Sequence, residues 1–443
     1  LAPFALGVIA LFAGDADIVY TDEDKIDASG RHFDPHCKPP WNPELLLGQN
    51  FVSHLTAIRR SVVVDVGGIR PGTEGSQDHD LLLRTTARVE SSRIVHAPFV
   101  AYHWRAIEGS TARASGEKSY TDAASINALR EHLGPEWTIG PSAAPSTFRC
   151  TPPLPTTPLV SILIPTRDRV ELLGQCVASL DRTTYPSFEI VVIDNDSTDP
   201  ATLEWMREFQ KDDDRRVVRS TGEFNFSRVN NDGARMARGE LILLLNNDTE
   251  VVEPDWLTEM VRWVDQPGVG AVGAKLLYPD DTIQHAGVVL GLGGLAGHGH
   301  HREDRHAYGY FSRLALAHEV GAVTGACLLT PRATWDELGG LDENLAVAFN
   351  DIDYCLRVRH AANQRVIWTP HALLYHHESV SRGAEDDLVK VARFNAEVDQ
   401  VLEDWGHTLD DDPAYSPNLT LVGESFTLAR QPRVEPPWFG TRD

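Results

Sequence analysis

The chain has 443 residues, 42% of them hydrophobic, and 64 acidic against 40 basic side chains give it a net charge of −24. This length and apolar content exclude wholesale disorder and indicate two or three globular domains. The negative charge excludes broad binding of nucleic acid through phosphate contacts, and the sequence has no run of 18 apolar residues that would predict a transmembrane helix.

The chain opens with an apolar segment, residues 1–12. This segment has the apolar character of a signal-peptide core but lacks a starting methionine and a basic leader, so we predict a buried helix. The missing methionine also leads us to expect that the sequence is a fragment of a longer chain.

Two distant parts of the sequence are alike, at a constant spacing of 273 residues. The matching pairs are Asp78/Asp351, Asp80/Asp353, Leu83/Leu356, Arg84/Arg357, Ile94/Ile367, Tyr102/Tyr375 and His103/His376. So many matches at one spacing indicate an internal repeat. We therefore expect residues 1–112 and about 251–384 to be two copies of one unit.

The region between the copies begins with a short predicted helix, residues 123–133, and continues with a linker rich in Pro, Ser, Thr and Ala, residues 140–158. Three apolar runs then alternate with helical patterns; the runs are residues 159–164, 188–193 and 241–245. Strands this uniformly apolar are buried on both faces, as in a parallel sheet. The alternation predicts an α/β fold that begins β-α-β-α-β.

Each of these three strands is followed by a polar cluster. The clusters contain Thr166 and Asp168, then Asp194 and Asp196, then Asn246 and Asp248. Ligands of open α/β sheets bind in the crevice at the carboxyl ends of the strands. One cluster alone would indicate a turn, but three together indicate a binding site.

The residue types suggest what this site binds. A carboxylate at a strand end, such as Asp248, is a hard oxygen ligand for Mg²⁺ or Mn²⁺, and Asp194 could accept hydrogen bonds from a base or a ribose. Asp351 begins a predicted helix, where a carboxylate is either functional or only a cap. His376 and His377 follow an apolar segment, and an imidazole there either completes a metal site or belongs to a surface pair.

In this order, the motifs resemble those of family-2 glycosyltransferases, which have the glycosyltransferase A fold. The motifs are Pro165-Thr-Arg-Asp168, Asp194-Asn-Asp-Ser-Thr-Asp199, Glu240-Leu-Ile-Leu-Leu-Leu-Asn-Asn-Asp248, Thr324-Gly-Ala-Cys327, Gly339-Gly-Leu-Asp342, Asn350-Asp-Ile-Asp353 and His376-His-Glu-Ser379. The resemblance covers about residues 157–384. Residues 385–443 are similar to the C-terminal helix and tail of tandem bacterial members that build O-antigen and other surface polysaccharides.

The resemblance implies a role for individual residues. The family's Asp-x-Asp metal motif falls on Asn246-Asn247-Asp248, so the metal bond rests on Asp248, and the distal metal ligand falls on His376, with His377 as a competitor. The family's catalytic base falls on Asp351.

The family's nucleotide-sugar contacts fall on Thr166, Asp168 and Asp194, together with the Asn246 and Asp248 positions of the metal motif. The implied enzyme is a Mn²⁺- or Mg²⁺-dependent inverting transferase. It moves a sugar from a dTDP-, UDP- or GDP-sugar to a saccharide or lipid-linked saccharide in surface-polysaccharide synthesis.

The first copy begins at a point that corresponds to the segment just after the metal motif. The expected organisation is therefore the C-terminal half of a truncated transferase unit (1–114), a helix and linker (115–156), a complete glycosyltransferase A domain (157–384) and a C-terminal helix and tail (385–443). Within the first copy, Tyr20-Thr-Asp22-Glu-Asp24 has the form of a metal motif but aligns with a later segment of the second copy, so we interpret it as a decoy.

Two other functions stay open. A nucleotidyltransferase would share the fold class but should have a Gly-rich loop where Pro165-Thr-Arg-Asp168 stands, and a non-catalytic saccharide-binding or scaffold protein would not need the acidic residues of the second copy. The five cysteines are scattered without a Cys-x-x-Cys pair, which fits a reducing compartment. We expect a cytoplasmic enzyme that becomes a peripheral protein at the inner face of the plasma membrane when its acceptor is lipid-linked.

Overall fold

The computed structural model describes residues 1–106, 119–378 and 388–434, in which the chain divides into two compact units. Unit 1 comprises Leu1–Pro153, Tyr308–His318 and Pro413–Asp443, and unit 2 comprises Leu154–Ala307 and Glu319–Asp412. The predicted domain ends at 114 and 384, and Ser379 of the last family motif, lie outside the described residues.

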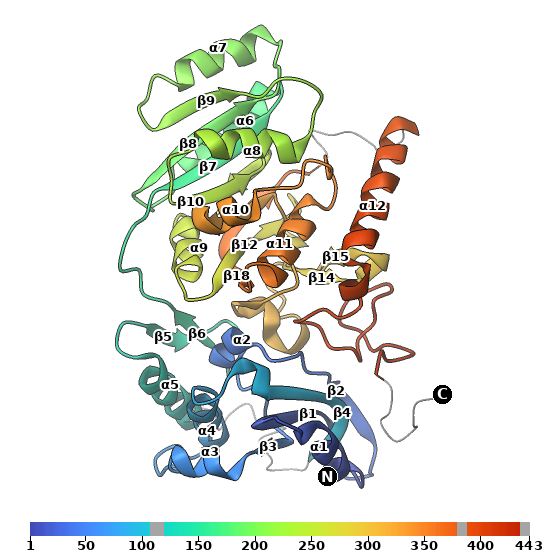
Figure 1. Ribbon diagram of the computed structural model, residues 1–443. Helices are drawn as coiled ribbons and strands as arrows, with labels where there is room; N and C mark the ends of the chain where they lie inside the picture. The colour runs from blue at the N-terminus through green and yellow to red at the C-terminus, as the bar shows by residue number, and fades with distance from the viewer. Residues whose placement is uncertain (107–118, 379–387, 435–443) are drawn as a thin grey trace. The chain divides into compact units, whose positions relative to one another are not determined.

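Unit 1 is built on a four-stranded sheet around β1, in which β3 pairs with the first residues of β1, β2 with its last residues, and β4 along its whole length (Figure 1). Its helices are α1 (Ala5–Ala13), α2 (Pro43–Gly48), α3 (Arg60–Asp65), α4 (Gln77–Thr86) and α5 (Ser119–Leu133), with short 3₁₀ turns at Ser91–Arg93 and Tyr310–Ala315. Its strands are β1 (Ile18–Ile26), β2 (His32–His36), β3 (Thr56–Ile58), β4 (Ile94–Arg105), β5 (Thr138–Pro141) and β6 (Phe148–Thr151).

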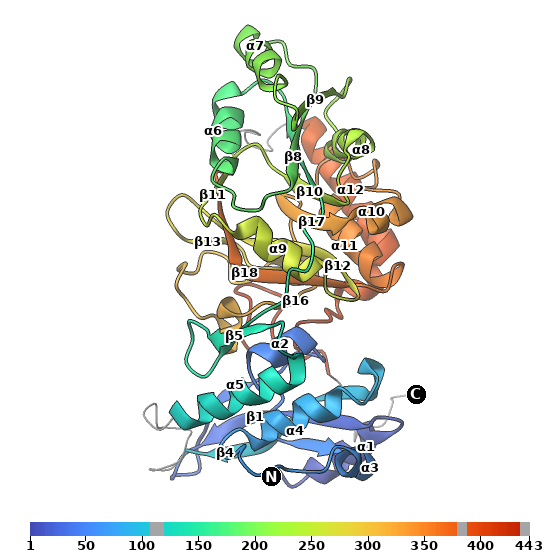
Figure 2. The same cartoon turned by 90° about the vertical axis from the view of Figure 1, so that its left-hand side faces the viewer.

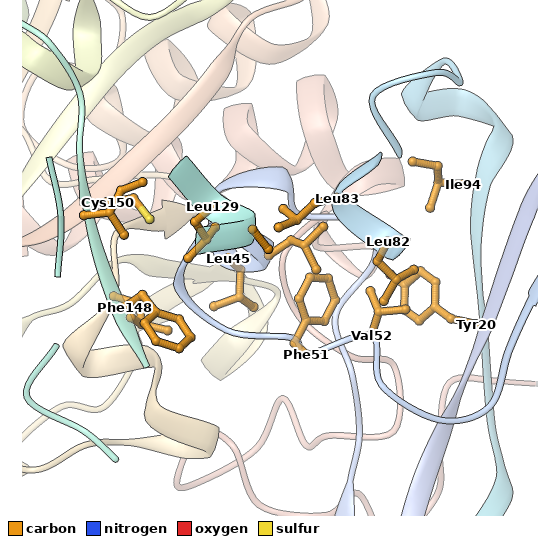
Figure 3. Close-up of a cluster of buried hydrophobic side chains, with 14 of the residues drawn as sticks. Tyr20, Leu45, Phe51, Val52, Leu82, Leu83, Ile94, Leu129, Phe148 and Cys150 are labelled. Atoms are coloured by element: carbon orange, nitrogen blue, oxygen red, sulfur yellow. The ribbon is translucent and has the colours of Figure 1, made fainter. Parts of the chain in front are cut away.

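Figure 3 shows the main core of unit 1, in which side chains from strands and helices meet. Tyr20 and Phe51 are almost fully buried and pack edge to face, with ring centroids 5.9 Å apart. The Tyr20 hydroxyl donates a hydrogen bond to the Pro39 carbonyl at 2.7 Å, so the buried phenol has a partner. Leu82 of α4 and Leu129 of α5 complete this layer and fix both helices to the sheet.

Two predictions for this region need correction. The predicted N-terminal helix exists as α1, but only Ala5 and Val8 are buried, whereas Leu6 and Leu11 are 72% and 60% exposed. The predicted linker, residues 140–158, contributes to a hairpin of β5 and β6, because the Ser- and Pro-containing segment 142–147 forms the turn between two short strands.

Unit 2 holds one large sheet with helices on both faces. Its helices are α6 (Val170–Leu180), α7 (Pro200–Phe209), α8 (Phe226–Met236), α9 (Trp256–Val264), α10 (Arg332–Leu338), α11 (Asn350–His360) and α12 (Leu388–Leu409). Its strands are β7 (Val160–Thr166), β8 (Phe188–Asp194), β9 (Arg215–Arg219), β10 (Leu241–Leu245), β11 (Thr249–Val251), β12 (Val269–Leu277), β13 (Ile283–His285), β14 (Val288–Leu290), β15 (Ala296–His298), β17 (Cys327–Pro331) and β18 (Arg365–His376), with β16 (His318–Glu319) at the unit boundary.

The order along the large sheet is β11-β18-β12-β17-β10-β7-β8-β9. The strands β10, β7, β8 and β9 are mutually parallel, as are β12 and β18, whereas β17 runs antiparallel to both of its neighbours. Figure 2 shows α6 and α8 on opposite faces of the parallel half. The predicted α/β class with a mostly parallel sheet is confirmed, and β7, β8 and β10 are buried along nearly their whole length.

Two elements between the second and third predicted strands were not predicted. The strand β9 has only partly buried residues, and α8 contains Asn230-Asn231-Asp232-Gly233, which has the composition of a turn. In the structure Asn225 caps α8 by accepting a hydrogen bond from the Arg228 amide at 2.9 Å. The other element, β9, adds an extra parallel strand at the edge of the sheet beside β8.

Each unit contains its own copy of the same local hydrogen-bond network. In unit 2, the Arg357 guanidinium donates to Asp353 Oδ2 at 2.7 and 2.8 Å and to the carbonyls of Leu338 and Gly340 at 2.9 and 2.8 Å. In unit 1, Arg84 donates in the same way to Asp80 and to the carbonyls at the corresponding positions, Val66 and Gly68.

The pairing of the long strands is also alike, since β1 and β4 are parallel, as are β12 and β18, and both pairs contain a register shift near the middle. Among the described helices, none combines the length and the apolar character needed to cross a membrane.

Candidate functional site

The site lies where β7, β10 and β18 end, and its centre is the loop Asn246-Asn247-Asp248 between β10 and β11. Because β11 pairs with β18, Thr249 lies opposite His376, and the loop is held beside the last residue of β18. Asn247 donates a hydrogen bond from Nδ2 to Thr166 Oγ1 at 3.1 Å, which ties the same loop to the end of β7. Three of the predicted residues, Thr166, Asp248 and His376, are therefore gathered by sheet pairing.

His376 faces the loop with one ring nitrogen and is anchored by the other. Its Nδ1 lies 2.6 Å from Gln284 Oε1, an atom that can only accept, so Nδ1 carries the proton. In the neutral form of the ring, Nε2 keeps its lone pair; this atom lies 3.1 Å from Asp248 Oδ1 and 3.2 Å from Asn246 Nδ2. Both His376 and Asp248 are buried, at 8% and 4% exposure.

This arrangement fits a divalent metal ion. Ligating histidines characteristically donate their second ring N–H to an acceptor, which fixes the tautomer and the direction of the lone pair. Gln284 provides that acceptor, and a buried carboxylate oxygen stands beside the free lone pair. His377, the competing residue, faces away, with Nε2 3.4 Å from Glu250 and only its backbone amide bonded to the Asp248 carbonyl.

Two cavities open from this centre and share part of their lining. The first has a volume of about 290 Å³, and four cationic side chains lie along it: Arg167, Arg169, Lys390 and Arg393. The second has a volume of about 560 Å³ and contains Asp351 and His376. Residues that line both cavities are Phe226, Asn246, Asp248 and Val347. The two cavities therefore adjoin one another at Asp248.

Asp351 lies in the first turn of α11, as predicted. Its Oδ2 accepts a hydrogen bond from the Gly325 amide at 2.8 Å, and its Oδ1 accepts one from the Ile352 amide at 2.9 Å. These two bonds hold the carboxylate against the wall of the larger cavity, where its remaining lone pairs can receive a proton.

Two histidines line the far side of this larger cavity. His298 lies with its Nδ1 2.9 Å from Nδ1 of His285, and burial lowers the pKa of both rings, so they are neutral near pH 7. His301 also lines the cavity and lies 3.0 Å from the Tyr278 hydroxyl. His298 and His301 therefore face the same cavity as Asp351.

The helix α12 forms part of the site as well. The Glu397 carboxylate, which is 2% exposed, accepts hydrogen bonds from the amides of Val347 and Ala348 at 3.0 and 2.9 Å. Val347 lines both cavities, so α12 fixes the loop between them and also supplies Lys390 and Arg393. This contribution was not predicted from the sequence, although two cations three residues apart on one helix, Lys390 and Arg393, are a visible signal.

Two predicted nucleotide contacts, Asp168 and Asp194, are not among the residues that line the two cavities. Asp168 Oδ1 accepts the amides of Thr198 and Asp199, both at 2.8 Å. Asp194 Oδ1 accepts the Ser197 amide at 2.9 Å. Both carboxylates thus organise the loops that follow β7 and β8.

The chain is similar to several known proteins. The family model described as "Glycosyl transferase family 2" matches residues 161–315. Uncharacterized protein y4gI of Sinorhizobium fredii is 49% identical over 94% of this chain and 46% of its own length. The O-antigen biosynthesis protein RfbC of Myxococcus xanthus is 39% identical over 98% of this chain and 34% of its own length.

The chain thus spans about half or less of the length of these relatives. Among solved structures, a mannosyltransferase from Pyrobaculum calidifontis in complex with GDP-Man and Mn²⁺ is 19% identical, covering 61% of this chain and 68% of that one, with a TM-score of 0.42. The similarity is carried by sequence, and residues 161–315 of this chain resemble glycosyl transferase family 2.

Proposed function

We propose that unit 2 is a metal-dependent, inverting glycosyltransferase. It moves a sugar from a nucleotide-sugar donor to a saccharide or lipid-linked saccharide acceptor in O-antigen-like surface-polysaccharide synthesis. The observation that carries the proposal is the meeting of two cavities at Asp248, one lined by cations and the other containing a carboxylate placed to act as a base.

The donor diphosphate occupies the smaller cavity. The side chains of Arg167, Arg169, Lys390 and Arg393 surround a space that suits a group with two negative charges. Thr166 and Asn246 line the same cavity and contact the donor. Asp168 and Asp194 act on the donor indirectly in this proposal, because their carboxylates hold the two loops that follow β7 and β8.

Asp248 and His376 would hold the divalent ion, Mn²⁺ or Mg²⁺, beside the diphosphate. When bound, such an ion neutralises the negative charge that develops on the departing nucleoside diphosphate. Gln284 keeps the His376 lone pair directed toward Asp248. The backbone pairing of β11 with β18 sets the distance between the two ligands.

Asp351 acts as the general base in the larger cavity. Its carboxylate takes the proton from an acceptor hydroxyl while that oxygen attacks the anomeric carbon, and the bond from this carbon to the diphosphate oxygen breaks. A single displacement of this kind inverts the configuration at the anomeric carbon. General-base assistance contributes about 10²–10⁴-fold to the rate.

Unit 1 is proposed to be a partial second copy of the transferase unit. The shared Asp–Arg network and the shared parallel pairing of the long strands support this proposal. The relatives are considerably longer than this chain, so the activity of a longer protein, its acceptor and its contact with the inner face of the membrane are part of the same proposal.

The test is donor turnover by the full chain. Purified chain is incubated with dTDP-, UDP- and GDP-sugars in the presence of Mn²⁺ or Mg²⁺, and released nucleoside diphosphate is measured with and without saccharide acceptors. Asp351→Asn should lower turnover by about 10²–10⁴-fold and leave donor binding intact. Asp336→Asn, an exposed acidic residue on α10, is the matched control and should keep wild-type turnover.

Three outcomes would count against the proposal. Near-normal turnover by Asp351→Asn would remove the base assignment. Donor binding without any turnover by the wild type would favour a saccharide-binding protein. Formation of a nucleotide sugar from a nucleoside triphosphate and a sugar phosphate would favour a nucleotidyltransferase.

A further inference from the structure

Unit 1 contains a cluster that the transferase site does not use. Among the described residues, Asp24, His32 and His103 are the one group of three such side chains whose ligand atoms all lie within 4.8 Å of one another. Asp24 belongs to the segment that we interpreted from the sequence as a decoy metal motif. The structure places it beside two imidazoles from different strands.

Each of three adjacent strands contributes one side chain. Asp24 lies on the central strand β1, His32 on its antiparallel neighbour β2, and His103 on its parallel neighbour β4, where it is the register partner of Asp24. His32 Nδ1 lies 2.7 Å from Asp24 Oδ2, and His103 Nδ1 lies 2.6 Å from Asp24 Oδ1. The two imidazole rings are nearly perpendicular, with centroids 4.5 Å apart, so both nitrogens approach the same carboxylate.

A neighbouring acid–histidine pair between β1 and β4 shows what a purely structural contact looks like in this sheet. Asp22 and His96 form a single contact of 2.8 Å, and their side chains are 0% and 5% exposed. The cluster is different because two imidazoles share one carboxylate and because the side chains of His32 and His103 are 49% and 23% exposed. An ion could enter from solvent and keep water as its remaining ligands.

We propose that Asp24, His32 and His103 form a divalent metal site in unit 1, separate from the Asp248–His376 centre of unit 2. Two imidazoles and one carboxylate are a ligand set that suits Zn²⁺ and similar borderline ions, with an open position for water. Ligand atoms that lie about 2.0–2.2 Å from one ion are farther from each other than the hydrogen-bonded nitrogen and oxygen atoms are here. Metal binding therefore moves these ligand atoms apart by less than about 1 Å, through side-chain rotation.

The bound ion joins β2, β1 and β4. His32 ends this connection close to the β1–β2 turn, since it is the register partner of Ile26, the last residue of β1. Metal binding is coupled to folding because the unfolded chain has no preformed site, so the ion stabilises unit 1.

The position of the cluster also parallels the centre of unit 2. His103 corresponds to His376 at the 273-residue spacing of the repeat. In unit 2 the histidine donates its Nδ1 proton to Gln284 on β13, the antiparallel neighbour of β12. In unit 1 the corresponding ring nitrogen, Nδ1 of His103, lies against the Asp24 carboxylate, and β2 contributes the imidazole of His32. A charged ligand and a second imidazole therefore stand in unit 1 where unit 2 has the neutral amide of Gln284.

The experiment uses the full chain, stripped of metal with a chelator and titrated with Zn²⁺ and, in parallel, with Co²⁺, whose visible absorption reports tetrahedral coordination. The wild type should bind an ion, and this binding should raise the thermal midpoint of unfolding. The same binding should be retained in Asp248→Asn. His32→Gln and His103→Gln should each weaken this binding by at least about tenfold. His54→Gln, a partly exposed histidine in contact with Glu23 on the same strand, is the matched control and should bind as the wild type does.

Wild-type affinity in His32→Gln would overturn the proposal, as would loss of all binding in Asp248→Asn. If His103→Gln fails to fold, His32→Gln decides the question, because the side chain of His32 is half exposed and its replacement leaves the core intact. Since the readouts are metal binding and stability, failure here is distinguishable from failure of the transferase proposal.

Discussion

Replacing Asp353 by Asn tests the network that holds the start of α11. The Asp353 carboxylate accepts two hydrogen bonds from Arg357 and a third, at 3.0 Å, from the Trp405 indole N–H of α12. The amide of Asn would present a donor to the guanidinium and remove the negative charge, so Arg357 would be left without its ionic partner. Asp353 is 5% exposed, so solvent cannot replace the lost contacts.

The expected magnitude follows from this burial. Removing one partner of a buried ion pair destabilises a protein by about 3–5 kcal/mol. The Arg357 side chain retains 19% exposure, so we expect the lower end, about 3 kcal/mol. For a unit of roughly 150–250 residues, each kcal/mol lowers the thermal midpoint by about 2–4 °C, which predicts a fall of roughly 6–12 °C.

The assay is thermal unfolding of the full chain followed by far-ultraviolet circular dichroism. Glu403→Gln removes one negative charge from an exposed position of α12 and should leave the midpoint unchanged. Replacing both partners, Asp353→Leu with Arg357→Met, should cost less than the two single changes summed, because no buried charge remains unpaired. A midpoint within about 2 °C of wild type for Asp353→Asn would refute the reasoning.

Further predictions concern pH, packing and metal binding. Burial holds the pKa of His79 below its usual value, so the stability that its neutral ring contributes is lost as the pH falls below about 6.5. The thermal midpoint of unfolding should therefore decline from about pH 7.5 to 5.5, and it should decline less steeply in His79→Gln. Gly273→Ala would place a Cβ atom 2.5 Å from the Cβ of Val323 and should lower stability by about 1–3 kcal/mol in denaturant titrations, whereas unchanged stability would mean that the strand yields freely. His376→Gln should weaken Mn²⁺ binding at least about tenfold in calorimetry and His377→Gln should not; the opposite ranking would reassign the ligand.

The sequence predicts the parallel half of the unit 2 sheet well because β7, β8 and β10 are apolar on both faces. The prediction fails for α8, where buried polar side chains form hydrogen bonds to the backbone. Asn230 donates to the Phe226 carbonyl at 2.8 Å and Asn231 donates to the Leu341 carbonyl at 2.9 Å, and both side chains are buried. Composition alone cannot distinguish such buried amides from the residues of a turn.

In the candidate site, too, some residues are predictable from the sequence and others are not. The sequence predicts Asp248, His376 and Asp351 from strand ends and a helix start. Sheet pairing brings Asp248 beside His376, α11 carries Asp351, and all three line the larger cavity. Gln284 and Arg393 were not predicted, because their roles depend on tertiary contacts between elements far apart in the sequence. Such contacts leave no local periodicity.

The most direct test of the central claim is the metal dependence of donor binding. We predict that the wild-type chain binds and turns over a nucleoside-diphosphate sugar with Mn²⁺ or Mg²⁺, loses both on chelation, and regains both when metal is restored. Asp248→Asn should remain defective after metal is restored. Donor turnover that is the same with and without chelator, or that survives in Asp248→Asn, would contradict the account.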